Sequence, residues 1–349
     1  MDKPDKLVPH QPDVQNSHWN YNTRIMKSDI CLDASKFAPD AISGSRLEYL
    51  HQLHESSKGK PALSKETIPA FREASEKAAV NLPGGEDILI PSRDLERQIP
   101  CRVFRNTKSL AKGVLLHIHG GGYALNTEKT SDPTLQRYVQ LTDYTVISVG
   151  YRRAPEHVFP AALEDCCDIA VYLVRHAQQQ FGAPFFVIAG DSVGGGLALQ
   201  TTFHLLRKFP DFYLKALVLF FGDFAPSGLP AVQHVQQPHM VDAQTRERYT
   251  SYYLPGRSTM DLQRPDVAPF YVNLEEFRGR LPPAQFLSGT VEALVDDSIM
   301  MCVKWQQAGG SGILKLVPGG FHRFMALPLE VEVAREGWSH VAEFLIEVL

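Results

Sequence analysis

The sequence predicts an α/β fold in which a mostly parallel central sheet is flanked by helices. Short apolar segments alternate with longer segments of helical pattern over residues 86–349, and this alternation is typical of parallel sheets with helices on both faces. At residue 192, a serine bounded by glycines stands where an apolar segment passes directly into a helical one. Strands that are joined through helices in this way form right-handed crossovers.

The strands are expected in the order of these apolar segments. The first two, residues 87–90 and 99–104, are expected to pair antiparallel. The later segments are almost continuously apolar, as strands buried on both faces are. These central strands are expected at residues 113–118, 145–149, 185–189, 214–221, 284–288 and 312–317. Helices are expected at residues 132–142, 160–178, 193–208, 297–308 and, last, near 330–347.

Two segments outside this alternation predict a helical cap. Helices are expected at residues 45–54 and 64–79, where Ser64 and Glu66 are typical of a helix start. A long insertion at about 224–281 interrupts the core and contains a helical pattern at residues 245–254. We therefore expect an N-terminal cap segment, residues 1–85, and a core, residues 86–349, that carries a cap insertion at about 224–281.

Composition excludes several classes of function. The chain has 349 residues, 44% of them hydrophobic, and a formal net charge of −4 without a long run of lysine or arginine. Nucleic acid is therefore not an expected partner. No apolar stretch approaches the ~18 residues that span a bilayer, and the N-terminus has no apolar secretory segment. The five scattered cysteines are typical of free thiols in a reducing compartment, so a cytoplasmic location is expected. The oligomeric state stays open, with a homodimer as one alternative.

Ser192 is the expected nucleophile. It lies in Gly190–Asp191–Ser192–Val193–Gly194, between the apolar run 185–189 and the helical run 197–206. The strained turn of such a nucleophile elbow exposes the serine hydroxyl at the edge of the sheet. The N-terminus of the following helix favours the negative charge that develops during acyl transfer. The pentapeptide alone is a weak signal, and a glycine-rich turn is the alternative interpretation.

A second glycine-rich loop strengthens the interpretation. His119 and three glycines follow the apolar run 114–118, as in the oxyanion-hole loops of lipases and esterases. The backbone N–H groups of Gly121, Gly122 and Val193 are expected to hold the oxyanion. Asp191 is expected to support the site by fixing neighbouring backbone.

The remaining members follow in the chain order that this arrangement requires: nucleophile, acid, histidine. His322, in a glycine-rich loop after the last expected strand, is the expected base. Glu292 is the expected acid, because a carboxylate at this place can orient the imidazole and stabilise its charged form.

Together with residues 151–157 and 159–162, these motifs resemble those of the hormone-sensitive lipase-like esterases, the α/β-hydrolase fold-3 group. The resemblance covers roughly residues 85–349 and implies an α/β-hydrolase fold, with His119 ordering the glycine loop. The family usually has an aspartate as the acid, so Glu292 departs from its pattern. Asp296 and Asp297 are the alternative acids, although both also suit the start of the next helix, where carboxylates cap N–H groups.

Aromatic side chains are the expected lining of a substrate pocket. Tyr123, Tyr252, Tyr253 and Phe270 are assigned to it, and packing within the cap is the alternative role of each.

The sequence thus predicts a serine carboxylester hydrolase that forms an acyl-enzyme on a small to medium, largely apolar ester. No metal and no cofactor are expected. An acyltransferase, a lactonase or a cyclisation catalyst with the same three residues is the first alternative, since the acyl-enzyme can react with something other than water. A non-catalytic small-molecule receptor on the same fold is the second.

Overall fold

A computed structural model describes residues 31–57, 59, 63–94, 96–106, 110–234 and 241–349. The chain divides into two units, Met1–Ala34 and Ser35–Leu349, and the description below concerns the second. Residues 1–30 of the predicted N-terminal cap segment lie outside the described residues.

Strands β1 to β8 form one sheet in the spatial order β1-β2-β4-β3-β5-β6-β7-β8. They are β1 Gly85–Pro91, β2 Gln98–Phe104, β3 Val114–Ile118, β4 Thr145–Val149, β5 Phe185–Asp191, β6 Ala216–Phe220, β7 Ala284–Gly289 and β8 Gly312–Val317. Strand β2 runs antiparallel to both β1 and β4, and all the other neighbours are parallel. The predicted fold class, a mostly parallel sheet that begins with an antiparallel pair, is confirmed.

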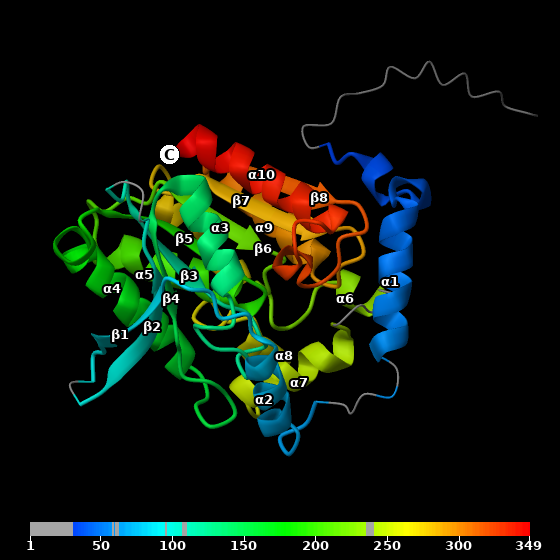
Figure 1. Cartoon of the computed structure of the whole chain (residues 1–349), viewed down its shortest axis with the longest axis horizontal. Coiled ribbons are helices and arrows are strands. Elements are labelled where there is room, and N and C mark those ends of the chain that lie inside the picture. Colours follow the sequence, from blue (N-terminus) through cyan, green and yellow to red (C-terminus); the bar gives the residue numbers. More distant parts are fainter. Residues whose placement is uncertain (1–30, 58, 60–62, 95, 107–109, 235–240) are drawn as a thin grey trace, which may run out of the picture. The chain divides into compact units, whose positions relative to one another are not determined.

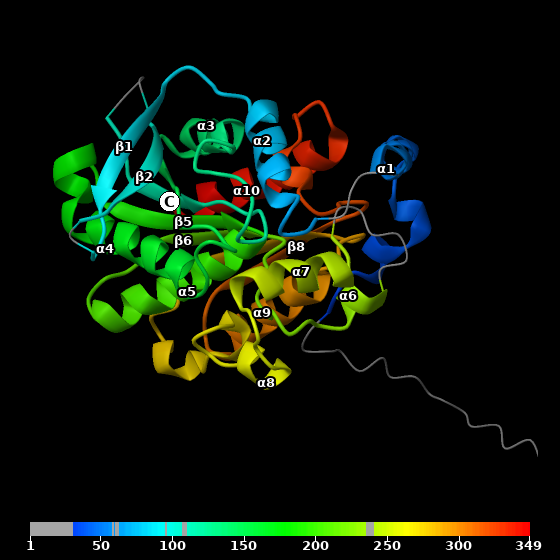
Figure 2. The same ribbon diagram turned by 90° about the horizontal axis from the view of Figure 1, so that it is seen from below.

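Helices cover both faces of this sheet. They are α1 Gly44–Ser57, α2 Ile68–Ala78, α3 Asp132–Thr142, α4 Ala161–Phe181, α5 Val193–Lys208, α6 Ala231–His234, α7 Ala243–Tyr253, α8 Thr259–Leu262, α9 Val295–Gln307 and α10 Glu332–Val348. Short 3-10 helices are η1 Ala34–Phe37, η2 Pro39–Ala41, η3 Pro269–Tyr271, η4 Leu274–Phe277 and η5 Phe324–Ala326. In Figure 2, α3 and α10 lie on one side of the sheet, and α4, α5 and α9 on the other. None of the described helices is long and apolar enough to cross a membrane.

The two faces of the sheet carry two separate apolar cores. Successive residues of one strand point to opposite faces, so Leu115 packs with α3 and α10 while Leu116 packs with α4 and α5. Each of these side chains is fully buried. Burial of apolar surface stabilises the folded state by about 25 cal/mol per Å². The buried strands therefore hold the sheet rigid, and the loops that begin at its edge are fixed at that end.

Helix α2 begins later than the sequence pattern predicts. It starts at Ile68, because Ser64 and Thr67 close a turn before it. The Ser64 backbone N–H donates to Thr67 Oγ1 at 2.7 Å, and the Thr67 N–H donates to Ser64 Oγ at 3.3 Å. The predicted Ser64 signal therefore marks a turn that leads into the helix.

The carboxyl ends of the parallel strands bring distant segments to one edge of the sheet (Figure 1). Strands β3, β5, β7 and β8 end at Ile118, Asp191, Gly289 and Val317. Each is followed by a loop that holds a predicted site residue, as expected for open α/β sheets.

Candidate active site

Ser192 occupies a strained turn between β5 and α5. Its φ of +55° and ψ of −127° form a combination that non-glycine residues rarely adopt. The turn is held from both sides, since the Ser192 N–H donates to the Phe220 carbonyl at 2.9 Å and its carbonyl accepts from Asp223 N–H at 3.0 Å. A side chain at Gly194 would collide with the Ile118 carbonyl, so α5 can start this close to β3 only with glycine there.

His322 lies within hydrogen-bond reach of the serine hydroxyl. Its Nε2 is 2.9 Å from Ser192 Oγ, and its Nδ1 is 3.0 Å from Glu292 Oε1. A carboxylate can only accept, so Nδ1 carries the proton and Nε2 presents a lone pair to the hydroxyl. The Phe221 ring packs beside the imidazole, 5.0 Å away between centroids. Ser192, His322 and Glu292 are 7%, 5% and 1% exposed, so these hydrogen bonds are largely shielded from water.

Glu292 is fixed by its own loop. The same Oε1 also accepts from the Leu294 N–H at 3.0 Å. The loop is joined to the histidine loop, where the Val291 N–H donates to the Gly320 carbonyl at 3.1 Å. Glu292 Oε2 is buried and has no partner among the described residues. One carboxylate oxygen therefore takes both hydrogen bonds, and its distance to the imidazole is set by backbone contacts.

Asp296 and Asp297, the alternative acids, face elsewhere. Asp297 Oδ1 accepts from the N–H groups of Phe224 and Ala225 at 2.9 Å each, and Asp296 Oδ2 accepts from Ala231 N–H at 2.8 Å. Helix α9 starts at Val295 with no side-chain cap, so the expected capping role is wrong. Both carboxylates instead anchor the start of the 224–281 insertion.

The glycine loop leaves backbone donors free near the serine. Gly121 and Gly122 have φ values of +118° and +62°, which turn the chain back so that the Leu125 N–H donates to the Gly121 carbonyl at 2.8 Å. Among the described residues, nothing accepts a hydrogen bond from the N–H groups of Gly121, Gly122 or Val193. A side chain at Gly122 would overlap the Tyr249 ring, so that ring closes one side of the loop.

His119 is a structural member of this loop. Its Nδ1 lies 2.8 Å from the Gly120 carbonyl, and its ring stacks on Tyr151 at 4.2 Å. Burial lowers the pKa of His119 to about 4. The imidazole is therefore neutral near pH 7, and its Nδ1–H donates to the carbonyl.

Asp191 lies beside the nucleophile, and its Oδ1 is 3.5 Å from His117 Nε2. Burial by itself would raise the pKa of Asp191, but the contact with His117 and the electrostatic influence of His117, His119 and Arg323 outweigh burial and hold that pKa below its usual value. The carboxylate is thus kept ionised within the site.

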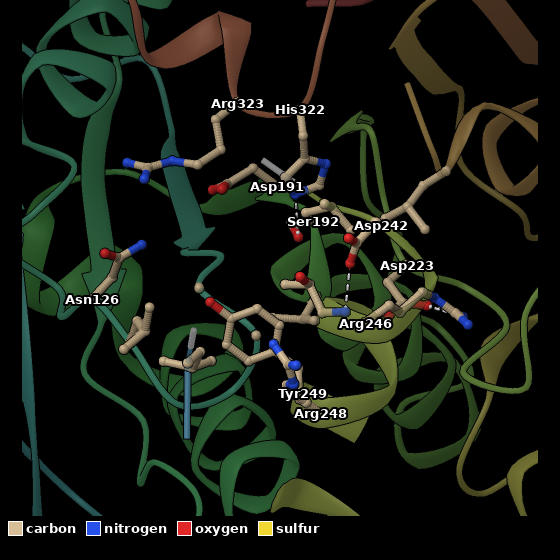
Figure 3. Close-up of a pocket in the computed structure, with 18 of the residues that line it drawn as sticks. Asn126, Asp191, Ser192, Asp223, Asp242, Arg246, Arg248, Tyr249, His322 and Arg323 are labelled. Carbon is tan, nitrogen blue, oxygen red and sulfur yellow. Dashed lines mark hydrogen bonds and ion pairs between the residues drawn. The ribbon is translucent and has the colours of Figure 1, made fainter. Parts of the chain in front are cut away.

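A cavity of about 570 Å³ opens onto Ser192 (Figure 3). Six of the predicted site residues line it: Gly121, Gly122, Asp191, Ser192, Val193 and His322. Its other walls include Leu53, His54, Ser56, Leu63 and Phe71, and, in and just before α7, Val241, Asp242, Thr245, Arg246, Arg248 and Tyr249. Besides Val193 and the Tyr249 ring, the apolar residues of the lining are Leu53, Leu63, Phe71, Leu125, Val241 and Leu294.

The four aromatic residues assigned to the pocket lie elsewhere, and this assignment is corrected. Tyr123 and Tyr253 are buried against each other, with ring centroids 4.0 Å apart. Tyr252 is also buried, and Phe270 packs against the core. None of the four lines the described cavity, whereas Tyr249 does. Tyr249 lies one turn before Tyr253 on the same face of α7, so the sequence pattern identifies the face but not the turn that reaches the cavity.

Apart from Asp191, the charged residues of the cavity were absent from the sequence prediction. Arg246 Nη2 donates to Asp223 Oδ1 at 2.8 Å, and both side chains are buried. Burial raises the pKa of the nearby Asp297 to about 7. The charge of Arg246 opposes this rise, and the charge of Asp223 adds to it. A buried ion pair carries no periodic signal that sequence reading could detect. Within the described ranges, no three His, Cys, Asp or Glu side chains are placed to hold a metal ion.

Comparison with known proteins finds similar sequences and folds. A family described as alpha/beta hydrolase fold matches residues 115–326. An ethyl acetate hydrolase of Pseudomonas putida is 31% identical over 265 residues, which cover 74% of this chain and 81% of that protein. An arylesterase of Saccharolobus solfataricus is 28% identical over 265 residues, or 73% of this chain and 82% of that protein. The solved structure of a hyperthermophilic esterase from Pyrobaculum calidifontis superposes with a TM-score of 0.76 at 26% identity, covering 88% of this chain and 99% of that one.

Proposed function

We propose a mechanism from one premise: the chain belongs to the hormone-sensitive lipase-like group of the α/β-hydrolase fold family, and it is an esterase-type hydrolase. The proposal is that it hydrolyses carboxylic esters through an acyl-enzyme on Ser192. The observation that carries it is the chain of hydrogen bonds from Ser192 Oγ through His322 to Glu292, at 2.9 and 3.0 Å.

In the first half-reaction, Ser192 Oγ bonds to the ester carbonyl carbon while its proton passes to His322 Nε2. Glu292 accepts the Nδ1–H hydrogen bond and stabilises the imidazolium that forms. The negative charge moves to the carbonyl oxygen, where the N–H groups of Gly121, Gly122 and Val193 are proposed to hold it. One such donor is worth about 3 kcal/mol of transition-state stabilisation. The carbon–oxygen bond to the alcohol then breaks, and His322 returns the proton to the leaving oxygen.

In the second half-reaction, water attacks the acyl carbon and gives a proton to His322 Nε2. The bond to Ser192 breaks, the acid leaves, and His322 returns the proton to Ser192 Oγ. No metal and no cofactor take part in either step. If an alcohol replaces water at this stage, the product is a transferred or cyclised ester, and if an amine replaces it, the product is an amide. The acyltransferase and cyclisation alternatives therefore differ from hydrolysis only in the acceptor, whereas a lactonase differs only in that its ester is cyclic.

The substrate is proposed to be a small to medium ester whose apolar part packs on the apolar wall of the cavity. The volume of about 570 Å³ lies within the range of ordinary small-molecule pockets. The cavity is lined by Leu53, Leu63 and Phe71 of the N-terminal segment and by Arg248 and Tyr249 of the insertion. The predicted division into an N-terminal segment 1–85, a core 86–349 and an insertion at 224–281 is therefore proposed to describe a cap and its catalytic core. The cytoplasmic location stays a prediction that cell fractionation can test.

The nucleophile is tested with Ser192→Ala and a fluorophosphonate probe. The variant is expected to lose almost all hydrolysis of short aryl esters while its circular dichroism stays that of the wild type. Mass spectrometry is expected to place the adduct on Ser192. Ser339, exposed on α10, supplies the matched control, since Ser339→Ala is expected to keep full activity. An adduct at another residue, or an active Ser192→Ala, refutes the mechanism.

A further inference from the structure

Two arginines line the catalytic cavity without a partner. Arg248, half-buried on α7, and Arg323, exposed next to His322, both belong to the lining. Figure 3 draws no hydrogen bond or ion pair to either guanidinium, and neither guanidinium has one elsewhere in the described chain. Most other arginines near the site are engaged, as Arg246 is with Asp223 at 2.8 Å. The cavity therefore holds two positive charges that the described residues do not neutralise by contact.

The backbone of Arg323 adds an independent observation. Its φ of +71° and ψ of +11° place it in the left-handed region, which glycine or asparagine adopts more readily than arginine. A residue strained in this way is disfavoured by about tenfold to a hundredfold in its local conformational equilibrium. Such residues cluster at functional sites. A long cationic side chain is thus held at a strained position beside the catalytic histidine, where it gains no partner from the protein.

The carboxylates of the cavity are already occupied. Asp223 is paired with Arg246. Asp242 Oδ1 accepts from Thr245 N–H at the start of α7, where the helix dipole favours a negative charge. Asp191 lies against His117 at 3.5 Å. The charge of Arg323 lowers the pKa of Asp191, but Figure 3 draws no ion pair between their side chains. The lining thus has three aspartates and three arginines, and Arg248 and Arg323 are the two arginines whose guanidinium groups contact no carboxylate of the described residues.

We propose that the substrate is an ester that also carries a carboxylate, or an anion of similar size, and that Arg248 and Arg323 attract this group. The inference rests on the proposed function, since it assigns the substrate class of the same site. Arginine suits the role because its planar fork donates two hydrogen bonds to one carboxylate. The apolar part of the ester lies on the apolar wall, the scissile carbonyl lies at Ser192, and the anionic group lies at the arginines.

The test compares esters that differ only in charge. The acetyl ester of para-hydroxybenzoate and that of para-hydroxybenzamide carry a carboxylate or a neutral amide on the alcohol side. The mono-para-nitrophenyl esters of adipic and adipamic acid make the same comparison on the acyl side. The quantity measured is kcat/KM of the anionic ester divided by that of its neutral partner, taken within one protein. Any change in the folded fraction or in the catalytic groups cancels in this ratio.

The variants are Arg248→Gln, Arg323→Gln, the double variant and Arg323→Glu. Arg257→Gln is the matched control, because Arg257, like Arg248, belongs to the 224–281 insertion but is exposed and lies outside the cavity lining. For at least one ester pair, each single variant is expected to lower the ratio about fivefold to tenfold, as expected for a partly exposed charged hydrogen bond. The double variant is expected to lower it further, Arg323→Glu to reverse the preference, and Arg257→Gln to leave it unchanged. Raising salt from about 0.01 M to about 1 M is expected to weaken the wild-type preference, since it shortens the screening length from about 30 Å to about 3 Å.

The outcomes separate this inference from the proposed function. Hydrolysis of the neutral esters with a ratio that no arginine variant changes by more than twofold overturns the inference and leaves the mechanism standing. A wild type that prefers the trimethylammonium analogue, the acetyl ester of para-hydroxyphenyltrimethylammonium, also overturns it. Hydrolysis that persists in Ser192→Ala, or no hydrolysis of any of these esters, refutes the proposed function, and the inference falls with it.

Discussion

Replacement of Glu292 by glutamine is the sharpest test of the site, because the acid is where this chain departs from its family. Glu292 Oε1 accepts from His322 Nδ1 and from Leu294 N–H, at 3.0 Å each. Glutamine keeps the size and removes the charge. Its oxygen can still accept both hydrogen bonds, but its NH₂ group then occupies the buried place of Oε2, where the described residues offer no acceptor.

The expected loss follows from the geometry. With 3.0 Å between the nearest heavy atoms, the centres of the carboxylate and the imidazolium lie about 4 Å apart. At an effective dielectric constant of about 20, this attraction is worth about 4 kcal/mol. It exists only while the imidazole is protonated, that is, in the transition state. Since about 1.4 kcal/mol corresponds to tenfold in rate, kcat is expected to fall about a thousandfold, and further if the amide turns its NH₂ toward Nδ1 and favours the wrong tautomer.

The assay is kcat for a short para-nitrophenyl ester, with circular dichroism and urea unfolding as checks of the fold. Glu292→Asp is the first control and is expected to keep partial activity, because it retains the charge at shorter reach. Asp296→Asn is the second and is expected to affect stability far more than kcat, since its carboxylate holds Ala231 N–H. If Glu292→Gln stays within tenfold of the wild type while Asp296→Asn or Asp297→Asn loses activity in a folded protein, the acid has been assigned wrongly.

Three further outcomes are expected. Gly122→Ala places a methyl group against the Tyr249 ring and should lower kcat at least tenfold, about the effect of weakening one oxyanion donor. The control Gly182→Ala, at a similar φ of +74° with no atom within 4 Å, should lower only the urea midpoint. Equal kcat values for the two variants would contradict this prediction. Tyr249→Ala should change the preference between short and long acyl chains in a kcat/KM series, because the ring lines the cavity, whereas an unchanged series would remove Tyr249 from the substrate pocket. Burial raises the pKa of Asp297 to about 7, above its usual value of about 3.9, so its contribution to stability is fully present below about pH 4 and is lost as the pH rises to about 7. The free energy of unfolding of the wild type should therefore fall relative to that of Asp297→Asn over this range, and a constant difference in urea titrations would be evidence against the shift.

Local chain geometry explains why much of the fold and site could be predicted. A nucleophile elbow needs a strand, a serine at positive φ and a helix in direct succession, and residues 185–208 contain all three. The glycine loop and the histidine loop likewise follow directly from β3 and β8. Parallel strands end at one edge, so order along the chain was enough to predict that Ser192, Glu292 and His322 come together.

The pocket could not be predicted in the same way. Tyr249 and Tyr253 lie on one face of α7, and only the position of that helix over the sheet decides that Tyr249 lines the cavity while Tyr253 stacks on Tyr123. The same limit applies to Asp297, whose partners at Phe224 and Ala225 are distant in sequence. The helix-start pattern predicts that Asp297 caps α9. In the fold, its carboxylate instead accepts from the N–H groups of Phe224 and Ala225.

The sequence by itself determined the order of strands and helices and the three residues at the predicted centre of the reaction, because turns, glycines and apolar runs act within a few residues of one another. Tertiary structure decided what surrounds that centre. Arg248 and Arg323 come from α7 and from the histidine loop, and nothing in either segment indicates that both line one cavity. Their place in one cavity depends on how α7 packs against the sheet edge, and that packing results from buried contacts among segments far apart in the chain.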